Sequence, residues 1–95
     1  MKDLAYVFYL TSLKTQWDLN HKGDYLSVIR WWHPTLVNGV RIYLNERIVI
    51  DQVNWLPKFQ DTFDFKLEEG QKVEVIMGRP RCQIFIDGVL RGGEE

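Results

Sequence analysis

The stretch 40-VRIYLNERIVI-50 decides the fold class of this chain. Its aliphatic residues Val40, Ile42 and Leu44 alternate with Arg41 and Tyr43, and alternation with a period of two places each set on one face of a β-strand. Asn45-Glu46 then forms a turn, and residues 47–53 follow as a second strand. The stretch therefore predicts a hairpin whose aliphatic face is buried.

The same pattern returns further along the chain. Residues 84–90 match residues 42–48 position by position in character, and Asp87-Gly88 is a strong hairpin signal. This similarity is better explained by two hairpins with the same geometric requirements than by gene duplication in so short a chain. Each hairpin puts one aromatic side chain, Tyr43 or Phe85, on the face opposite its aliphatic residues. If these two rings lie close together, they form an apolar patch suited to a partner, so we predict both as partner-binding residues.

Short runs of β-branched and aromatic residues, separated by turn signals, occupy the rest of the chain. We expect a polar segment at 14–24, within which residues 20–24 form a loop, and a frayed tail at 92–95. The expected strands are 4–13, 25–32, 40–45, 47–53, 59–65, 71–77, 82–86 and 89–91. Phe59, Phe63 and Phe65 share one strongly apolar face, and Val73, Val75, Met77, Cys82, Ile84 and Ile86 face inward. The pattern predicts an all-β fold, an antiparallel two-sheet β-sandwich of seven to eight strands that forms a single domain over residues 1–95.

The composition limits the classes of function. The chain of 95 residues is 45% hydrophobic and 14% aromatic, with a net charge of −1 and no basic block. Nucleic-acid binding requires clustered Lys and Arg, so we expect neither nucleic acid nor a membrane surface as partner. The N-terminal apolar run is far too short for a membrane span. A single cysteine, Cys82, cannot form an internal disulfide, which favours a cytoplasmic location.

The chain offers no recognisable set of catalytic or metal-binding residues. Cys82 falls on an inward face, where a thiol behaves as a small hydrophobe. His21 and His33 flank one strand at opposite ends, and no zinc-binding spacing is present. We therefore expect no enzymatic activity, no catalytic residue, no metal and no cofactor.

Two clusters of side chains allow both a structural and a functional interpretation. The bend Arg79-Pro80-Arg81, with Arg91 nearby, has guanidinium groups that suit an anion, but solvated hairpin residues explain it better. Trp31 and Trp32 are adjacent in a strand and must point to opposite faces. One should enter the core, while the other faces outward or covers a sheet edge, where it would provide a ligand platform.

Over about residues 4–91 the sequence resembles one half of the Fas apoptotic inhibitory molecule family. The residues that carry the resemblance are, in order, His33, Thr35, Gly39, Arg41, Ile42-Tyr43-Leu44, Asn45-Glu46-Arg47, Trp55 and Thr62-Phe63. Asn45-Glu46 departs from the family's usual Asp-Gly turn. The resemblance implies a β-sandwich without catalytic activity that works by protein contacts. It does not imply a role in apoptosis.

The chain is rich in aromatic residues and has no recognisable set of catalytic residues. This combination leads to one principal hypothesis about function and two alternatives. We expect a non-enzymatic protein-interaction module that binds a protein partner or itself. Its expected partner-binding residues are Tyr43, Phe85, Trp31, Trp32, His33 and Trp55. The first rival is a galectin-like carbohydrate-binding domain that uses a Trp platform with His33, Asn38 and Arg41. The second is a small enzyme, which would need a cleft that so small a sandwich rarely offers.

Overall fold

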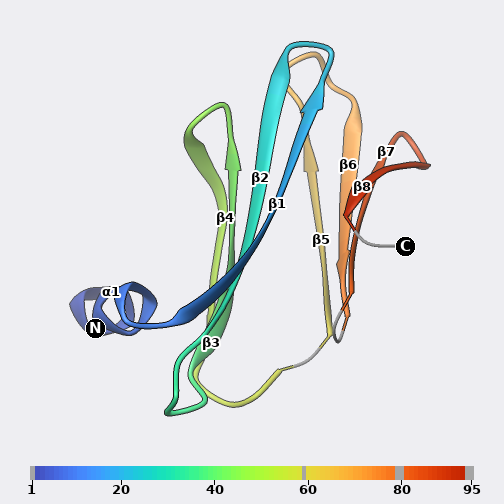
Figure 1. Ribbon diagram of the computed structural model, residues 1–95. Coiled ribbons are helices and arrows are strands. Elements are labelled where there is room, and N and C mark those ends of the chain that lie inside the picture. The colour runs from blue at the N-terminus through green and yellow to red at the C-terminus, as the bar shows by residue number, and fades with distance from the viewer. Residues whose placement is uncertain (1, 59, 79–80, 94–95) are drawn as a thin grey trace.

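The computed structural model describes residues 2–58, 60–78 and 81–93, and Figure 1 shows their arrangement as two antiparallel sheets with a short N-terminal helix. Each sheet is a meander in which consecutive strands are neighbours, in the orders β1-β2-β3-β4 and β5-β6-β7-β8. The elements are α1 (Lys2–Leu10), β1 (Leu13–His21), β2 (Asp24–Trp32), β3 (Asn38–Leu44), β4 (Arg47–Asn54), β5 (Asp61–Lys66), β6 (Lys72–Met77), β7 (Cys82–Ile86) and β8 (Val89–Gly93). The all-β sandwich expected from the sequence is confirmed.

One shared core joins the two sheets. The first sheet contributes Leu26, Val28, Val40, Ile42 and Leu44, the second contributes Phe63, Val73, Val75, Met77, Cys82, Ile84 and Ile86, and Leu67 joins them from the turn after β5. Every residue expected to face inward on β6 and β7 is buried, and Cys82 is fully enclosed. Burial in an apolar environment disfavours a thiolate, so Cys82 is a packing residue.

Three two-residue turns connect the hairpins β1–β2, β3–β4 and β7–β8. Their central pairs are Lys22-Gly23, Asn45-Glu46 and Asp87-Gly88, and all six residues have positive φ. Positive φ at both central positions is typical of the type I′ turn, whose twist matches that of the flanking strands. Asn45 fits this conformation because asparagine tolerates it better than most residues do.

The two similar sequence segments, 42–48 and 84–90, form structurally equivalent hairpins. Tyr43 pairs with Ile48 in the first hairpin, and Phe85 pairs with Leu90 in the second. The register shifts by one residue directly before each aromatic residue, between Ile42 and Tyr43 and between Ile84 and Phe85. Each hairpin forms one side of its sheet.

The N-terminal part of the chain differs from the expectation. The strand expected at 4–13 is wrong for most of its length, because the backbone over Lys2–Leu10 is an α-helix. The polar segment at 14–24, for which no strand was expected, belongs mostly to β1, and the loop expected at 20–24 is reduced to the turn at Lys22-Gly23. β1 is an edge strand with only Trp17 and Leu19 packed against the core, so its apolar alternation is short. Once β1 occupies that edge, the apolar residues before it pack on the sheet as a helix, which satisfies its own backbone hydrogen bonds.

Smaller differences concern the ends of strands. Gly92-Gly93, expected in a frayed tail, belongs to β8. Gly92 lies against the side chain of Leu19, where β8 passes beside β1 and closes that edge of the sandwich. Phe59, expected as the start of a strand, lies outside the described residues, as do Arg79, Pro80, Glu94 and Glu95.

Candidate functional site

One end of the sandwich carries most of the exposed apolar side chains. Among the described residues eleven large hydrophobic side chains are exposed, and seven of them belong to α1, to the start of β1 or to the two loops at this end. They are Tyr6, Val7, Leu10, Leu13, Leu36, Trp55 and Leu56. In Figure 1 this end lies at the bottom, where the β2–β3 loop and the segment after β4 turn near the helix. We call it the apolar end.

Helix α1 is attached to the sheet by aromatic contacts. The ring of Phe8 lies 4.7 Å from the His33 ring and 6.0 Å from the Trp55 ring, between centroids and with edge-on geometry. Tyr9 contacts Trp31 in the same way at 5.8 Å. Tyr6, Val7 and Leu10 nevertheless remain more than half exposed. Residues 6–10 of the helix are therefore apolar both toward the sheet and toward solvent, whereas a surface helix normally has a polar outer face.

The β2–β3 loop presents Leu36 in an unusual backbone conformation. Leu36 has a φ of +73°, and its side chain is 54% exposed. The left-handed region disfavours a residue with a large side chain and is found where the surroundings hold it. Here the Leu36 amide donates to the His33 carbonyl oxygen at 2.8 Å, and Thr35 donates its amide to His33 Nδ1 at 3.2 Å. The fold thus holds a leucine outward at this end.

Asn38 holds both loops of the apolar end together. It is only 3% exposed, and its Nδ2 donates to the carbonyl oxygens of Leu36, at 3.0 Å, and Leu56, at 3.2 Å. Its Oδ1 accepts a hydrogen bond from Asn54 Nδ2 at 3.1 Å. One buried amide therefore positions the backbone of two exposed leucines from different loops.

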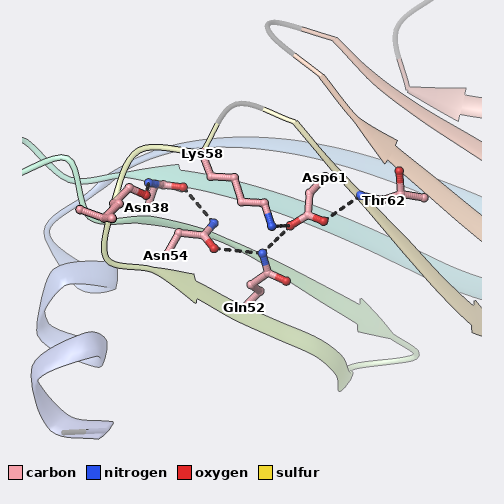
Figure 2. A network of polar contacts seen from close by, with 7 residues as sticks. Asn38, Gln52, Asn54, Lys58, Asp61 and Thr62 are labelled. Carbon is pink, nitrogen blue, oxygen red and sulfur yellow. Dashed lines mark hydrogen bonds and ion pairs between the residues drawn. The ribbon is translucent and has the colours of Figure 1, made fainter.

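A chain of polar contacts extends from Asn38 to the second sheet (Figure 2). Gln52 Nε2 donates to Asn54 Oδ1 at 3.0 Å and to Asp61 Oδ2, and Lys58 Nζ lies 2.9 Å from the same carboxylate oxygen. The amide of Thr62 donates to Asp61 Oδ1 at 2.9 Å. Partial burial of Asp61 raises its pKa, but the hydrogen bonds from Lys58, Gln52 and Thr62 outweigh burial and leave the pKa below its usual value.

These contacts tie β4 to β5 and attach Lys58, in the segment that follows β4, to Asp61. A second bridge joins the sheets at the same end, where the buried side chain of Arg30 donates through Nη1 to the Gly78 carbonyl oxygen at 2.5 Å. A depression of about 400 Å³ opens over the segment, lined by residues 53–58, which include Trp55, Leu56 and Pro57. The apolar end thus combines exposed side chains with a held backbone and a hollow.

The structure separates the two aromatic residues that were expected to form one patch. Tyr43 lies on the outer face of the first sheet and Phe85 on the outer face of the second, because each alternates with residues of the shared core. The outer faces of a sandwich point in opposite directions. Tyr43 and Phe85 are both partly buried and do not form a common surface.

The two adjacent tryptophans take opposite faces, as expected, but with an unexpected distribution of burial. Trp31 points to the outer face of its sheet, yet it is only 1% exposed because the helix covers it. Trp32 shares the inner face with Arg30, whose guanidinium carbon lies 5.8 Å from its ring, and it is partly exposed at the end of the sandwich. Trp31 is thus closed to a partner, while Trp32, His33 and Trp55 lie at the apolar end.

The residue set expected for a sugar is not brought together. Asn38 lies buried on the inner face, whereas Arg41 lies on the outer face, where it contacts Asp51 at 3.4 Å. His33 packs against Phe8. These three polar side chains do not line one surface with a tryptophan.

Several residues of the apolar end were missed by sequence reasoning, namely Tyr6, Val7, Leu10, Leu13, Leu36 and Leu56. The leucines of the two loops carried a usable signal. Leu36 and Leu56 each lie beside a proline-containing turn segment, in positions where a polar residue is the usual choice.

The comparisons with known proteins leave the family open: no protein-family model matches the chain, and the searches of curated proteins and of solved structures gave no match. Within residues 2–58, 60–78 and 81–93, no group of three or more His, Cys, Asp or Glu residues is placed to hold a metal ion. The described residues also include no helix with the length and hydropathy of a membrane span.

Proposed function

We propose that this protein is a non-enzymatic interaction module that docks a protein partner, or a second copy of itself, on the apolar end. The observation that carries the proposal is that seven of the eleven exposed large apolar side chains among the described residues lie at one end of the sandwich. Large exposed apolar patches on small soluble domains are typical of interaction sites.

The held geometry of the loops supports the same conclusion. Asn38 positions the backbone at Leu36 and at Leu56, so two exposed leucines keep a defined separation. A preformed surface binds with a smaller loss of conformational entropy than a flexible one. The hollow along residues 53–58 suits a protruding side chain of a partner. A role in protein contacts also agrees with the family resemblance suggested by the sequence.

The purified chain tests this proposal by light scattering coupled to size-exclusion chromatography over a range of concentrations. The test variant combines Leu10→Ser with Leu56→Ser, whose side chains are 55% and 78% exposed, so the fold should tolerate both changes. The matched control combines Ile48→Ser with Val89→Ser, which are 47% and 49% exposed next to hairpin turns elsewhere. Self-association that the test variant loses and the control keeps would identify a second copy as the occupant.

A different protein as occupant gives a different result. The chain is then monomeric, but the dye ANS binds to it, and binding falls in the Leu10→Ser, Leu56→Ser variant while the control retains it. A monomer whose dye binding is the same in both variants would contradict the proposal, because the apolar end would then not be an accessible patch.

A further inference from the structure

A second depression lies on the outer face of the first sheet. It has a volume of about 380 Å³ and is lined by Gln16 of β1, by Tyr25, Ser27 and Ile29 of β2, by Tyr43 of β3 and by Glu46 of the following turn. The pairing register explains why they meet, since Gln16 is opposite Ile29 and Ser27 is opposite Tyr43. We call it the tyrosine groove.

The tyrosine groove is acidic and aromatic. Among its lining residues Glu46 is charged and none is basic, and Tyr25 is 40% exposed. The turn holds Glu46 at a φ of +69°, directly after Asn45, whose amide donates to the Tyr25 carbonyl oxygen at 2.8 Å. The carboxylate is thus carried on a short, fixed turn beside two phenol rings.

A second carboxylate adjoins the tyrosine groove. Asp18 Oδ1 accepts a hydrogen bond from Gln16 Nε2 at 2.9 Å, and the same nitrogen lies 3.0 Å from Ser27 Oγ. The hydrogen bond from Gln16, followed by that from Ser27, lowers the pKa of Asp18, and the hydrogen bond to Asp18 raises the pKa of the Tyr25 phenol. At neutral pH Asp18 therefore carries its charge, and Tyr25 remains an uncharged ring.

Two cations on the same sheet face are engaged by Tyr9 of α1. The guanidinium carbon of Arg41 lies 4.1 Å and Lys14 Nζ lies 4.7 Å from the centroid of its ring. Arg41 also contacts Asp51 at 3.4 Å and donates through Nη1 to the Tyr43 hydroxyl at 3.4 Å, so this guanidinium borders the tyrosine groove at Tyr43 and is paired with Asp51. Within the described residues neither Glu46 nor Asp18 forms an ion pair with these cations, so both carboxylates can attract a cation from outside.

We propose that the tyrosine groove binds the cationic side chain of a lysine or arginine from a peptide or protein ligand. Aromatic rings attract a cation through their π-electrons, and a neighbouring carboxylate adds a direct charge interaction. Charge complementarity argues for this occupant over a neutral one. The tyrosine groove and the apolar end are different surfaces, so the proposal stands independently of the proposed function.

A titration of the ¹⁵N-labelled chain with Nα-acetyl-lysine N-methylamide, followed by NMR, tests it. We expect saturable shifts at the amides of Tyr25, Ser27, Tyr43 and Glu46, and the arginine derivative should shift the same amides. The norleucine derivative, which has no charge, should produce none of these shifts. Equal shifts with norleucine, or no shifts with either cation, would overturn the proposal.

Variants provide the second arm of the experiment. Glu46→Gln keeps the shape of the tyrosine groove and removes one charge, so we expect lysine affinity to fall by about two- to fivefold. The control is Glu69→Gln, at an exposed turn between β5 and β6, which should leave the affinity unchanged. An unchanged affinity in Glu46→Gln would contradict the proposal. Stronger binding of a neutral oligosaccharide at the same amides would instead assign the groove to carbohydrate.

Discussion

Tyr9 meets Trp31 edge-on, with ring centroids 5.8 Å apart and ring planes at 88°. This contact covers an indole that points away from the sandwich core, and it leaves Trp31 only 1% exposed. The first sheet therefore has apolar residues on both faces, with the second sheet covering one and α1 covering part of the other. The same helix therefore buries Trp31 and contributes exposed side chains to the apolar end.

Removal of the Tyr9 ring should release the helix. We expect Tyr9→Ala to lower the free energy of unfolding by about 1–3 kcal/mol, since it removes packing on Trp31 and the ring that Arg41 and Lys14 contact. Hydrogen exchange of the Trp31 indole N–H, which is buried, should become faster. Tyr6→Ala, at a ring that is 53% exposed, is the control and should change stability by less than about 0.5 kcal/mol. Unchanged indole exchange in Tyr9→Ala would show that α1 does not protect Trp31.

Gly39 faces Trp31 across the β2–β3 pair and has no room for a side chain. A Cβ at this position would lie 2.7 Å from the Trp31 ring and would also collide with the Gln52 carbonyl oxygen. We expect Gly39→Ala to destabilise the fold by about 1–3 kcal/mol, measured by urea unfolding. Gly92→Ala is the matched control, because its nearest contact, at 3.4 Å, is a flexible leucine. Equal stability of the two variants would count against this packing.

Loss of the Asn38 side chain should loosen both loops at once. Asn38→Ala removes the hydrogen bonds to Leu36 and Leu56 and leaves buried polar groups without a partner, so we expect a loss of about 1–3 kcal/mol. Backbone hydrogen exchange in the two loops should also increase. The control is Asn20→Ala at an exposed position of β1, where the change in stability should stay within about 0.5 kcal/mol. If the two loops keep their protection from hydrogen exchange in Asn38→Ala, the Asn38 side chain does not hold them together.

Asp61 should make stability depend on pH in the acid range. Its pKa in the folded chain is below the usual value, because hydrogen bonds from Lys58, Gln52 and Thr62 outweigh the opposing effect of burial. The folded state therefore binds this proton less readily than the unfolded state does, so the stabilising contribution is complete well above the unfolded pKa of about 3.9 and is lost as the pH falls through the folded value.

Asp61→Asn tests that contribution in urea unfolding measured between neutral and strongly acid pH. The wild-type chain should be more stable than the variant at neutral pH, and the difference should shrink as the pH falls through the acid range. Asp64→Asn, at an exposed position of the same strand, provides the control. A difference that does not vary with pH would mean that Asp61 contributes through shape and not through its charge.

The sequence predicted those parts of the fold that depend on neighbouring residues. Alternation on β3, β6 and β7 identified which side chains enter the core, and Asn45-Glu46 and Asp87-Gly88 marked their turns, because strand faces and turn conformations are local properties. The weak alternation of β1, where Trp17 and Leu19 are the core contacts, was too short to be recognised among polar residues. The candidate site was predicted in part, through Trp32, His33 and Trp55.

Only the tertiary structure decided how these elements meet. The sequence determined that Tyr43 and Phe85 face outward, and the division into two sheets decided that they face opposite ways. The sequence also determined that Trp31 and Trp32 occupy opposite faces, but the position of α1 decided that the outward indole is the buried one. Leu36 and Leu56 are twenty positions apart, and the buried amide of Asn38 brings their backbones together. Burial depends on what covers a side chain, and the covering element lies far along the chain, beyond the reach of any local pattern.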